Sequence, residues 1–173
     1  MGKVNLVLFE PEIPQNTANI MRTCLATNTK LHLIEPLGFS LEEKYLKRAS
    51  ANHMKLMHFE VYKNYPEFLE TMQGKMIFLT RYGLKNFYEI NFKNIEEDIY
   101  LVLGKESTGI PYDLLRGHLD DCYRLPMANQ VRSLNLSNAA AIVVYEVMRQ
   151  LGFSSLSFYE PENFKGKNFL KNI

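Results

Sequence analysis

Short apolar runs alternate along the chain with longer stretches in which apolar and polar residues recur at helical spacing. The apolar runs predict six strands, at residues 4–9, 31–34, 56–62, 76–80, 99–103 and 122–125. The runs at 4–9 and 99–103 contain almost no polar residue, which is typical of strands buried on both faces. Because helical stretches separate the strands, the pattern predicts an α/β fold, a mostly parallel sheet with helices on both faces.

Apolar residues three and four positions apart predict the helices between these strands. The helices cover residues 16–28, 41–50, 66–72, a short segment that begins at Pro111, and 134–151. We expect Asn16 to cap the first helix and Gly152 to end the last one. Residues 81–97 are polar and irregular, and no periodicity extends past the last helix. We therefore expect a single domain over residues 1–153 and a flexible tail over 154–173.

Composition narrows the class of protein. The 173 residues include 20 Lys and Arg and 19 Asp and Glu, so any contact with nucleic acid must come from local clustering of charge. Cys24 and Cys122 lie in apolar runs and are interpreted as buried free thiols of a cytosolic protein. The start of the chain has no secretory pattern, and the longest apolar run, 139–145, is too short to span a bilayer. We expect a soluble, cytoplasmic protein without a membrane partner.

Several kinds of chemistry lack their motifs. The four histidines are scattered, and the chain has neither HExxH nor CxxC, so we expect no metal site. The chain also lacks the GxSxG motif, which argues against a hydrolase of that type. The segment 104–109 has the two glycines of a phosphate loop, but Ile110 and Pro111 stand where that loop needs Lys and Ser or Thr. This argues against a small kinase or another nucleotide-hydrolysing enzyme.

Three polar clusters follow predicted strands. In the first, Asn16, Asn19 and Arg22 recur at i, i+3 and i+6 and form a polar face on the first helix. Such a face near a helix start suits an anion, and Arg22 can hold a phosphate or carboxylate with two hydrogen bonds. An N-cap followed by ordinary surface residues explains the same pattern.

The second cluster is the loop 104–109, directly after the most apolar strand. Open α/β sheets bind ligands at this end of their strands, and Gly104 allows a ligand to approach the backbone closely. A plain strand-to-helix turn is the alternative.

The third cluster lies between the last strand and the last helix. It holds more polar residues than capping needs, namely Ser133, Asn135, Ser137 and Asn138. Taken by itself, the third cluster is explained by a capped core helix. Three such clusters at successive strand ends, however, favour a ligand-binding crevice.

The three clusters together resemble the motifs of the SPOUT methyltransferases. The first motif is matched by Pro14, Asn16, Asn19 and Arg22, and the second, G-x-E-x-x-G-x-P, by Gly104, Glu106, Gly109 and Pro111. The third is matched by residues 125–127 and 132–139. The segments 10–17 and 145–152 are similar to the subfamily of minimal tRNA 2'-O-methyltransferases that act on the wobble nucleotide, a cytidine or uridine at position 34. The likeness covers residues 3–153, with Ala18 and Lys105 where the family usually has Gly and often Pro.

The resemblance implies an α/β fold with a deep trefoil knot near the C-terminal end of the domain. It implies that S-adenosylmethionine is the methyl donor, bound by Leu79, Gly104, Glu106, Leu125 and Ser133. It also implies an obligate homodimer that packs through the first and last helices and acts on tRNA without a metal. Small and apolar residues of the last helix suit that interface, namely Ile142, Val143, Tyr145 and Val147.

Methyl transfer to a ribose hydroxyl benefits from a group that takes or polarises its proton. The family gives this role to the arginine that matches Arg22. An arginine in a protein stays protonated, so its part is either that of a base or that of an electrostatic orienter. Asn16, Ser133 and Asn135 complete the expected catalytic set. Two alternatives are an RNA-binding protein of this fold without activity and a 2'-O-methyltransferase acting on another tRNA or rRNA site.

Overall fold

The strands of the protein form one parallel sheet. The computed structural model describes residues 2–41, 58–154 and 156–173. Within these residues the sheet has seven strands in the order β3-β2-β1-β6-β4-β7-β5, and every neighbouring pair is parallel. The strands are β1 Val4–Phe9, β2 Lys30–Ile34, β3 Phe59–Tyr62, β4 Lys75–Leu79, β5 Lys85–Asn86, β6 Ile99–Leu103 and β7 Cys122–Arg124. The predicted α/β class and mostly parallel sheet are confirmed.

The two most apolar runs lie side by side near the middle of the sheet. Strand β1 pairs with β6 from Val4 opposite Ile99 to Leu8 opposite Leu103, and every residue of both strands is buried. Alternate side chains of these strands enter two separate cores, one on each face of the sheet. Burial on both faces explains why the sequence shows no alternation of polar and apolar residues there.

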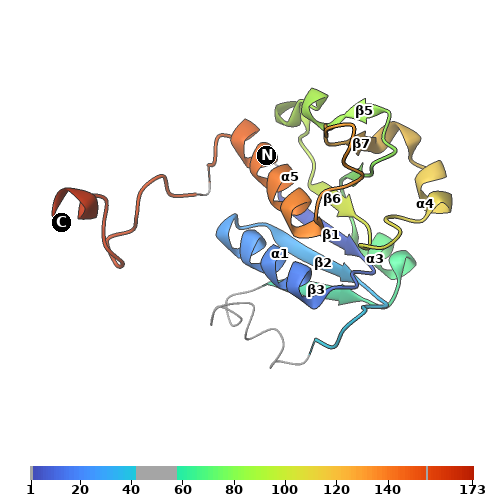
Figure 1. Cartoon of the computed structure of the whole chain (residues 1–173), viewed down its shortest axis with the longest axis horizontal. Helices are drawn as coiled ribbons and strands as arrows, with labels where there is room; N and C mark the ends of the chain where they lie inside the picture. The colour runs from blue at the N-terminus through green and yellow to red at the C-terminus, as the bar shows by residue number, and fades with distance from the viewer. Residues whose placement is uncertain (1, 42–57, 155) are drawn as a thin grey trace.

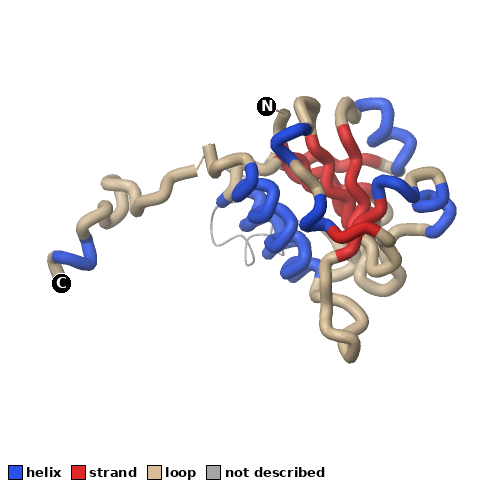
Figure 2. Tube along the Cα trace, turned by 90° about the horizontal axis from the view of Figure 1, so that it is seen from above, coloured by secondary structure: helices blue, strands red, loops and turns tan. Residues whose placement is uncertain are grey.

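Helices cover both faces of the sheet. Helices α1 Pro14–Ala26 and α5 Leu136–Gln150 pack beside each other on one face, whereas α3 Tyr65–Thr71 and α4 Tyr112–Arg116 supply core residues on the other (Figure 1). Figure 2 shows the strands between these two groups of helices. Short 3-10 turns at Phe87–Glu89, Phe92–Asn94, Leu119–Asp121 and Phe169–Lys171 complete the described elements.

The start of helix α1 differs from the prediction. Ile13 is the N-cap and Pro14 opens the first turn, so Asn16 lies inside the helix and does not cap it. Proline suits this position because it has no N–H group to leave without a partner. The Asn16 side chain is buried and bonds to another part of the chain.

Helix α5 follows the prediction at both ends. Its N-cap is Asn135, whose side chain accepts hydrogen bonds from the backbone of Ser137 and Asn138. The chain leaves the helix through Gly152, whose φ of +74° is the left-handed conformation that glycine adopts without strain.

The expected interface residues of α5 divide into two kinds. Val143 and Val147 are fully buried against the sheet, so they belong to the core and cannot form an outer interface. The reason is helical geometry, because residues four apart lie on one face, and this face packs on the sheet. Ile142 and Tyr145 are 38% and 47% exposed and lie on the outer side.

Three other regions differ from the predicted elements or lie outside the described residues. Strand β5, Lys85–Asn86, falls in the segment predicted to be irregular, because a two-residue pairing with β7 leaves no periodic pattern in the sequence. The predicted strand at 56–62 is described from Phe59 to Tyr62. The predicted helix at 41–50 lies almost wholly outside the described residues.

Buried titratable groups behave as core residues. His32 is 3% exposed, and its ring nitrogens lie 3.2 Å from Asn5 Oδ1 and 2.9 Å from the Tyr62 hydroxyl. Burial lowers the pKa of His32 to about 4, so its ring is neutral near pH 7. Cys24 and Cys122 are buried free thiols, as predicted, and burial raises the pKa of Cys24 to about 12.

No helix in the described part of the chain is long and apolar enough to cross a bilayer. The same residues contain no group of three or more acidic, histidine or cysteine side chains placed to hold a metal ion. Beyond α5 the described residues contain only the turn Phe169–Lys171 as regular structure, and this segment runs away from the sheet in Figure 1.

Candidate active site

A cavity of about 650 Å³ opens at the carboxyl ends of three neighbouring strands. Leu103 ends β6 and Gly104 follows it, Leu79 ends β4, and Leu125 follows β7. This is the size of a small-molecule site, and it lies where parallel α/β sheets bind ligands. Its inner wall is apolar and includes Leu79, Leu103, Ile110, Leu125 and Leu136.

The loop from Gly104 to Gly109 forms one side of the cavity. A Cβ atom on Gly104 would lie 2.2 Å from the backbone of Gly109 and of Ile110, far inside contact distance. Gly104 is therefore required by the close return of its own loop. The Gly109 N–H donates to the Lys105 carbonyl at 2.9 Å, and Gly109 has a φ of +76°. These features close the loop tightly over its own backbone.

Four residues from distant parts of the chain join beside this loop. Asn135 Nδ2 donates to Asn16 Oδ1 at 3.0 Å, and Asn16 Nδ2 donates to Glu106 Oε1 at 2.8 Å. The backbone N–H of Glu12 donates to the other Glu106 oxygen at 2.8 Å. We call Glu12, Asn16, Glu106 and Asn135 the polar junction. It connects all three of the polar clusters that the sequence contains.

The direction of these hydrogen bonds requires a carboxylate at position 106. Asn135 Oδ1 accepts from backbone N–H groups of α5, so the Asn135 amide nitrogen must point to Asn16. Asn16 then accepts with its oxygen and has only N–H groups left for Glu106. Both oxygens of Glu106 face donors, and a glutamine there would place an N–H against an N–H. The glutamate of the second motif is explained by this requirement.

Two further contacts tie the loop after β1 to the loop after β6. The Glu12 carboxylate accepts from the Ser107 hydroxyl and from the Ser107 N–H, both at 2.8 Å. The hydrogen bonds from Ser107 hold the pKa of Glu12 below its ordinary value. Lys105 Nζ lies 2.6 Å from Glu10 Oε2. Lys105, which departs from the family pattern, is thus paired within the chain. The sequence analysis missed both acidic partners, because no local pattern links residues ninety-five positions apart.

The mouth of the cavity carries a second group, which we call the aromatic corner: Arg81, Tyr82, Tyr112 and Arg132. The Tyr82 and Tyr112 rings are 5.6 Å apart at an interplanar angle of 77°, and the Tyr112 hydroxyl donates to that of Tyr82 at 3.2 Å. The Arg81 guanidinium lies 4.5 Å from the centre of the Tyr82 ring and donates to its hydroxyl. These hydrogen bonds, first that from Tyr112, lower the pKa of Tyr82.

The aromatic corner was not predicted as part of the site. Arg81 and Tyr82 fall in the segment described as polar and irregular, although their place directly after β4 was a usable signal. Within the described part of the chain, neither Arg81 nor Arg132 makes an ion pair.

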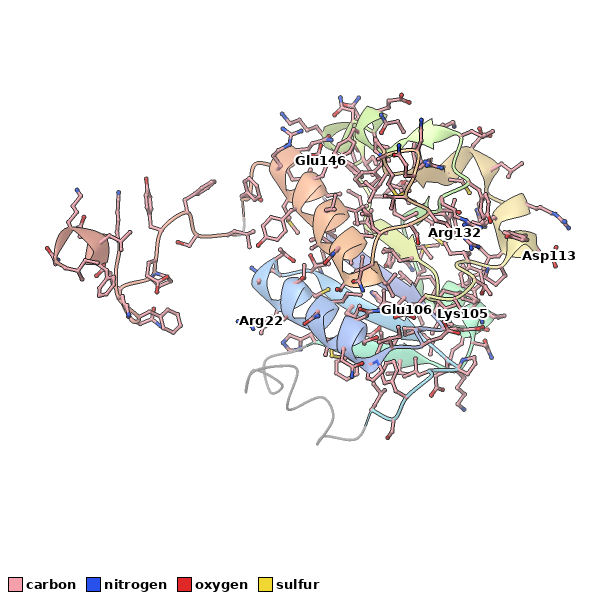
Figure 3. The ribbon with its side chains drawn as sticks, in the orientation of Figure 1. Arg22, Lys105, Glu106, Asp113, Arg132 and Glu146 are labelled. Carbon is pink, nitrogen blue, oxygen red and sulfur yellow. The ribbon has the colours of Figure 1, made fainter. Side chains whose placement is uncertain are left out.

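Arg22 lies apart from the cavity. The side chain is exposed on the outer side of α1, and Figure 3 shows it directed away from Glu106 and Arg132. An α-helix turns by about 100° per residue, so Arg22 lies about 120° around the axis from Asn16 and about 9 Å along it. Arg22 is therefore not among the residues that line the cavity of its own chain.

The other predicted site residues line the cavity together. They are Asn16, Leu79, Gly104, Glu106, Leu125, Ser133 and Asn135. Asn16, Glu106 and Asn135 use their side chains to bind one another, whereas Ser133 makes no such bond and lies exposed at the edge.

A parallel sheet with a cavity at its carboxyl edge defines a ligand-binding α/β protein. Comparison with known proteins gives the particular family. The family model described as the SpoU rRNA Methylase family matches residues 3–145. The chain belongs to this family.

The chain is similar to several named proteins over nearly their whole length. A Bacillus subtilis (strain 168) protein is 46% identical over 88% of this chain and 96% of its own, and bears the name "Putative tRNA (cytidine(34)-2'-O)-methyltransferase". A tRNA (cytidine(34)-2'-O)-methyltransferase of Saccharophagus degradans is 43% identical over 87% of this chain and 97% of its own. A solved structure from work on 2-OH methylation of C/U34 on tRNA has a TM-score of 0.79 at 36% identity, and covers 87% of this chain and 97% of that one.

Proposed function

We propose that this protein is an enzyme that transfers a methyl group from S-adenosylmethionine to the ribose 2'-hydroxyl of the tRNA wobble nucleotide, a cytidine or uridine at position 34. The observation that carries the proposal is the meeting of the three polar clusters around one cavity at the carboxyl edge of the sheet. The names of similar proteins, 43% and 46% identical, agree with this reaction and this position.

The cavity suits an adenosine-containing donor. Leu79, Leu125 and Ile110 provide apolar walls for a planar base, and backbone groups at Leu79, Gly104 and Leu125 lie at its edge. Glu106 acts indirectly, because both of its oxygens are already engaged in the polar junction. Ser133 is free to contact the ligand at the cavity edge. When bound, S-adenosylmethionine would supply a sulfonium methyl group for in-line attack by the ribose oxygen: the C–S bond breaks, S-adenosylhomocysteine leaves, and the hydroxyl proton passes to water.

The protein's part in this reaction is to hold the ribose in line and to stabilise the charge that develops on its oxygen. An arginine does this without giving up its proton, which agrees with the persistent charge of guanidinium. Arg22 is the candidate because the resemblance places it in this role and it is exposed. Arg22 does not line the cavity of its own chain, so in this role it would enter the cavity of a second copy of the chain.

We therefore include a homodimer in the proposal. Helices α1 and α5 lie beside each other and present a continuous outer surface with Ile142 and Tyr145 at 38% and 47% exposure. A two-fold axis through this surface would place each Arg22 next to the partner. A dimer of this kind would account for an exposed Arg22 on the outer side of α1.

The same proposal includes a trefoil knot within one domain, residues 1–153. Strand β7 inserts between β4 and β5, and the chain then passes the cavity and returns through α5 to β1 and β6. Such a return past earlier segments supports a threaded chain. Residues 154–173 are proposed to be a flexible tail, and the protein is proposed to act in the cytoplasm, where tRNA is its partner.

One experiment tests the reaction. Pure protein is incubated with unmodified tRNA and labelled S-adenosylmethionine, and the nucleosides are separated by mass spectrometry. We expect 2'-O-methylcytidine or 2'-O-methyluridine. A folded protein that binds tRNA and donor yet forms neither product would instead favour an RNA-binding protein without activity. A methylated nucleoside mapped to another position would favour a different tRNA or rRNA site.

A further inference from the structure

The aromatic corner lies at the cavity mouth but has no part in the polar junction. Its two arginines carry positive charge without a carboxylate partner among the described residues. Its two tyrosine rings are about half exposed, Tyr82 at 50% and Tyr112 at 57%. Exposed aromatic rings gathered beside a cavity are typical of binding surfaces, and the solvated charge of the arginines stays available to an anionic ligand.

The geometry of the corner provides two planar surfaces at nearly a right angle. Arg81 stacks 4.5 Å from the centre of the Tyr82 ring, and the Tyr112 ring stands at 77° to Tyr82. The corner is already organised, because Tyr112 bonds to Tyr82 and Arg124 Nη1 donates to the Arg81 carbonyl at 2.7 Å. Such planes, tyrosine or guanidinium, are what unstacked bases of single-stranded RNA bind.

We infer that Arg81, Tyr82, Tyr112 and Arg132 form an RNA-binding site that stacks a nucleobase next to the methylated nucleotide and holds a phosphate through Arg132. This inference rests on the proposed function for the identity of the RNA. RNA is favoured over the methyl donor because the corner has two unpaired cations and lies at the solvent-exposed mouth. The donor's planar base is better served by the apolar inner wall.

Stacking on the aromatic corner would favour RNA in which the bases are unpaired. A base must leave the helical stack to lie against Tyr82 or Tyr112, and bases in a loop do this at lower cost than paired bases. The corner would therefore select a nucleotide in a single-stranded loop and place its neighbour over the cavity. Charge from Arg132 would bind the backbone regardless of sequence.

The test measures binding of a fluorescent anticodon stem-loop RNA by anisotropy and binding of S-adenosylmethionine by calorimetry. The variants are Tyr82→Leu, Tyr112→Leu and Arg132→Gln. Matched controls are Tyr88→Leu, an exposed tyrosine elsewhere on the surface, and Lys93→Gln, an exposed cation. Tyr82→Phe keeps the ring and removes only the hydroxyl.

We expect each tyrosine-to-leucine change to weaken RNA binding roughly tenfold, while donor binding changes less than about twofold. Arg132→Gln should weaken RNA binding and reduce the slope of log affinity against log salt by about one. Both controls should bind RNA within about twofold of the native protein, and Tyr82→Phe should weaken binding less than Tyr82→Leu because it keeps the ring. Thermal melting of every variant confirms that it is folded.

Two results would overturn the inference: folded corner variants that bind the stem-loop like the native protein, or variants that lose donor affinity and keep RNA affinity. Neither result depends on methyl transfer. If the native protein forms no methylated product but the corner variants lose RNA binding, the proposed reaction fails and this site stands. If the native protein methylates tRNA and the corner variants bind normally, the reaction stands and this site fails.

Discussion

The polar junction and the aromatic corner line the same cavity but differ in how their polar groups are satisfied. In the junction, the Asn16, Glu106 and Asn135 side chains bind one another or the backbone. In the corner, Arg81 and Arg132 have no ion-pair partner in the described part of the chain. Arg22 on α1 resembles the corner in this respect, because it is an exposed cation without an ion pair among the described residues.

The difference separates residues that build the cavity from residues that meet a ligand. A buried donor that loses its acceptor costs about 1–3 kcal/mol, so changes in the junction should appear first as lost stability. An exposed cation contributes little to folding, so changes at Arg22 or in the corner should appear as lost binding or activity.

The largest effect is expected at Arg22. Arg22→Ala should lower the single-turnover rate of methyl transfer roughly 100- to 1,000-fold, because a charge that stabilises the transition state is removed. Donor affinity and melting temperature should remain close to native values, because Arg22 is exposed and is not among the residues that line the described cavity. Arg22→Lys should restore only part of the rate, since it keeps the charge and loses the planar fork. The single-turnover rate is measured by stopping reactions at set times and counting the labelled methyl groups on the tRNA.

A mixed dimer tests whether Arg22 acts on the partner's cavity. Ser133→Trp places a large side chain at the exposed edge of the cavity and blocks it, and each variant alone should be nearly inactive. Mixing Arg22→Ala and Ser133→Trp chains should restore about a quarter of native activity, because half of the dimers then have one complete site. If activity is not restored after subunit exchange, Arg22 does not act on the cavity of the partner. An Arg22→Ala protein that is dimeric and methylates tRNA normally would contradict the catalytic assignment itself.

The second effect concerns Glu106. Glu106→Leu leaves the Asn16 amide and the Glu12 N–H without an acceptor and should reduce the free energy of unfolding by about 3 kcal/mol. For a chain of this size, the melting temperature should fall by about 10 °C. Glu106→Gln should also destabilise, by at least about 1 kcal/mol, because it opposes an N–H to an N–H. Urea unfolding measures both.

Glu89→Gln serves as the control for Glu106, because Glu89 is exposed and its loss should change stability by less than about 0.5 kcal/mol. If Glu106→Gln is as stable as the native protein, the hydrogen-bond directions of the polar junction are wrong.

The smallest effect is a pH dependence at Glu12. Hydrogen bonds from Ser107 lower its pKa below the ordinary value of 4.5, so the bonded carboxylate stabilises the folded state above that value. The stabilisation is lost as pH falls through the lowered pKa of the folded protein. Glu12→Gln should therefore flatten the decline of melting temperature in acid, as measured by calorimetry at several pH values. An unchanged acid profile would show that the Ser107 contacts contribute nothing to stability.

The sheet was predictable because its central strands contain strong local signals. The runs 4–9 and 99–103 are wholly buried, and their length and apolar character indicate strands without any tertiary information. Helix α5 was equally clear, with Asn135 as its cap and Gly152 after its end. Strand β5 could not be found, because its two residues become a strand only by pairing with β7.

The loop and junction side of the cavity was predictable from the motifs, but the aromatic corner and the directions of the side chains were not. Asn16 was interpreted as a helix cap because the sequence shows only its neighbours, whereas its partners Glu106 and Asn135 are 90 and 119 residues away. Val143 and Val147 were assigned to an interface for the same reason. The orientation of Arg22 depends on how α1 is rotated against the sheet, which spacing alone does not determine.

The most direct test of the proposed reaction removes the acceptor hydroxyl. Two tRNAs are assembled that differ from the natural one by a single 2'-deoxynucleotide, one at position 34 and one at position 32. Both are incubated with pure protein and labelled S-adenosylmethionine. We predict that the tRNA with deoxyribose at position 34 takes up no label, whereas the one changed at position 32 is labelled like unaltered tRNA. Equal labelling of both would contradict 2'-O-methylation of the wobble nucleotide.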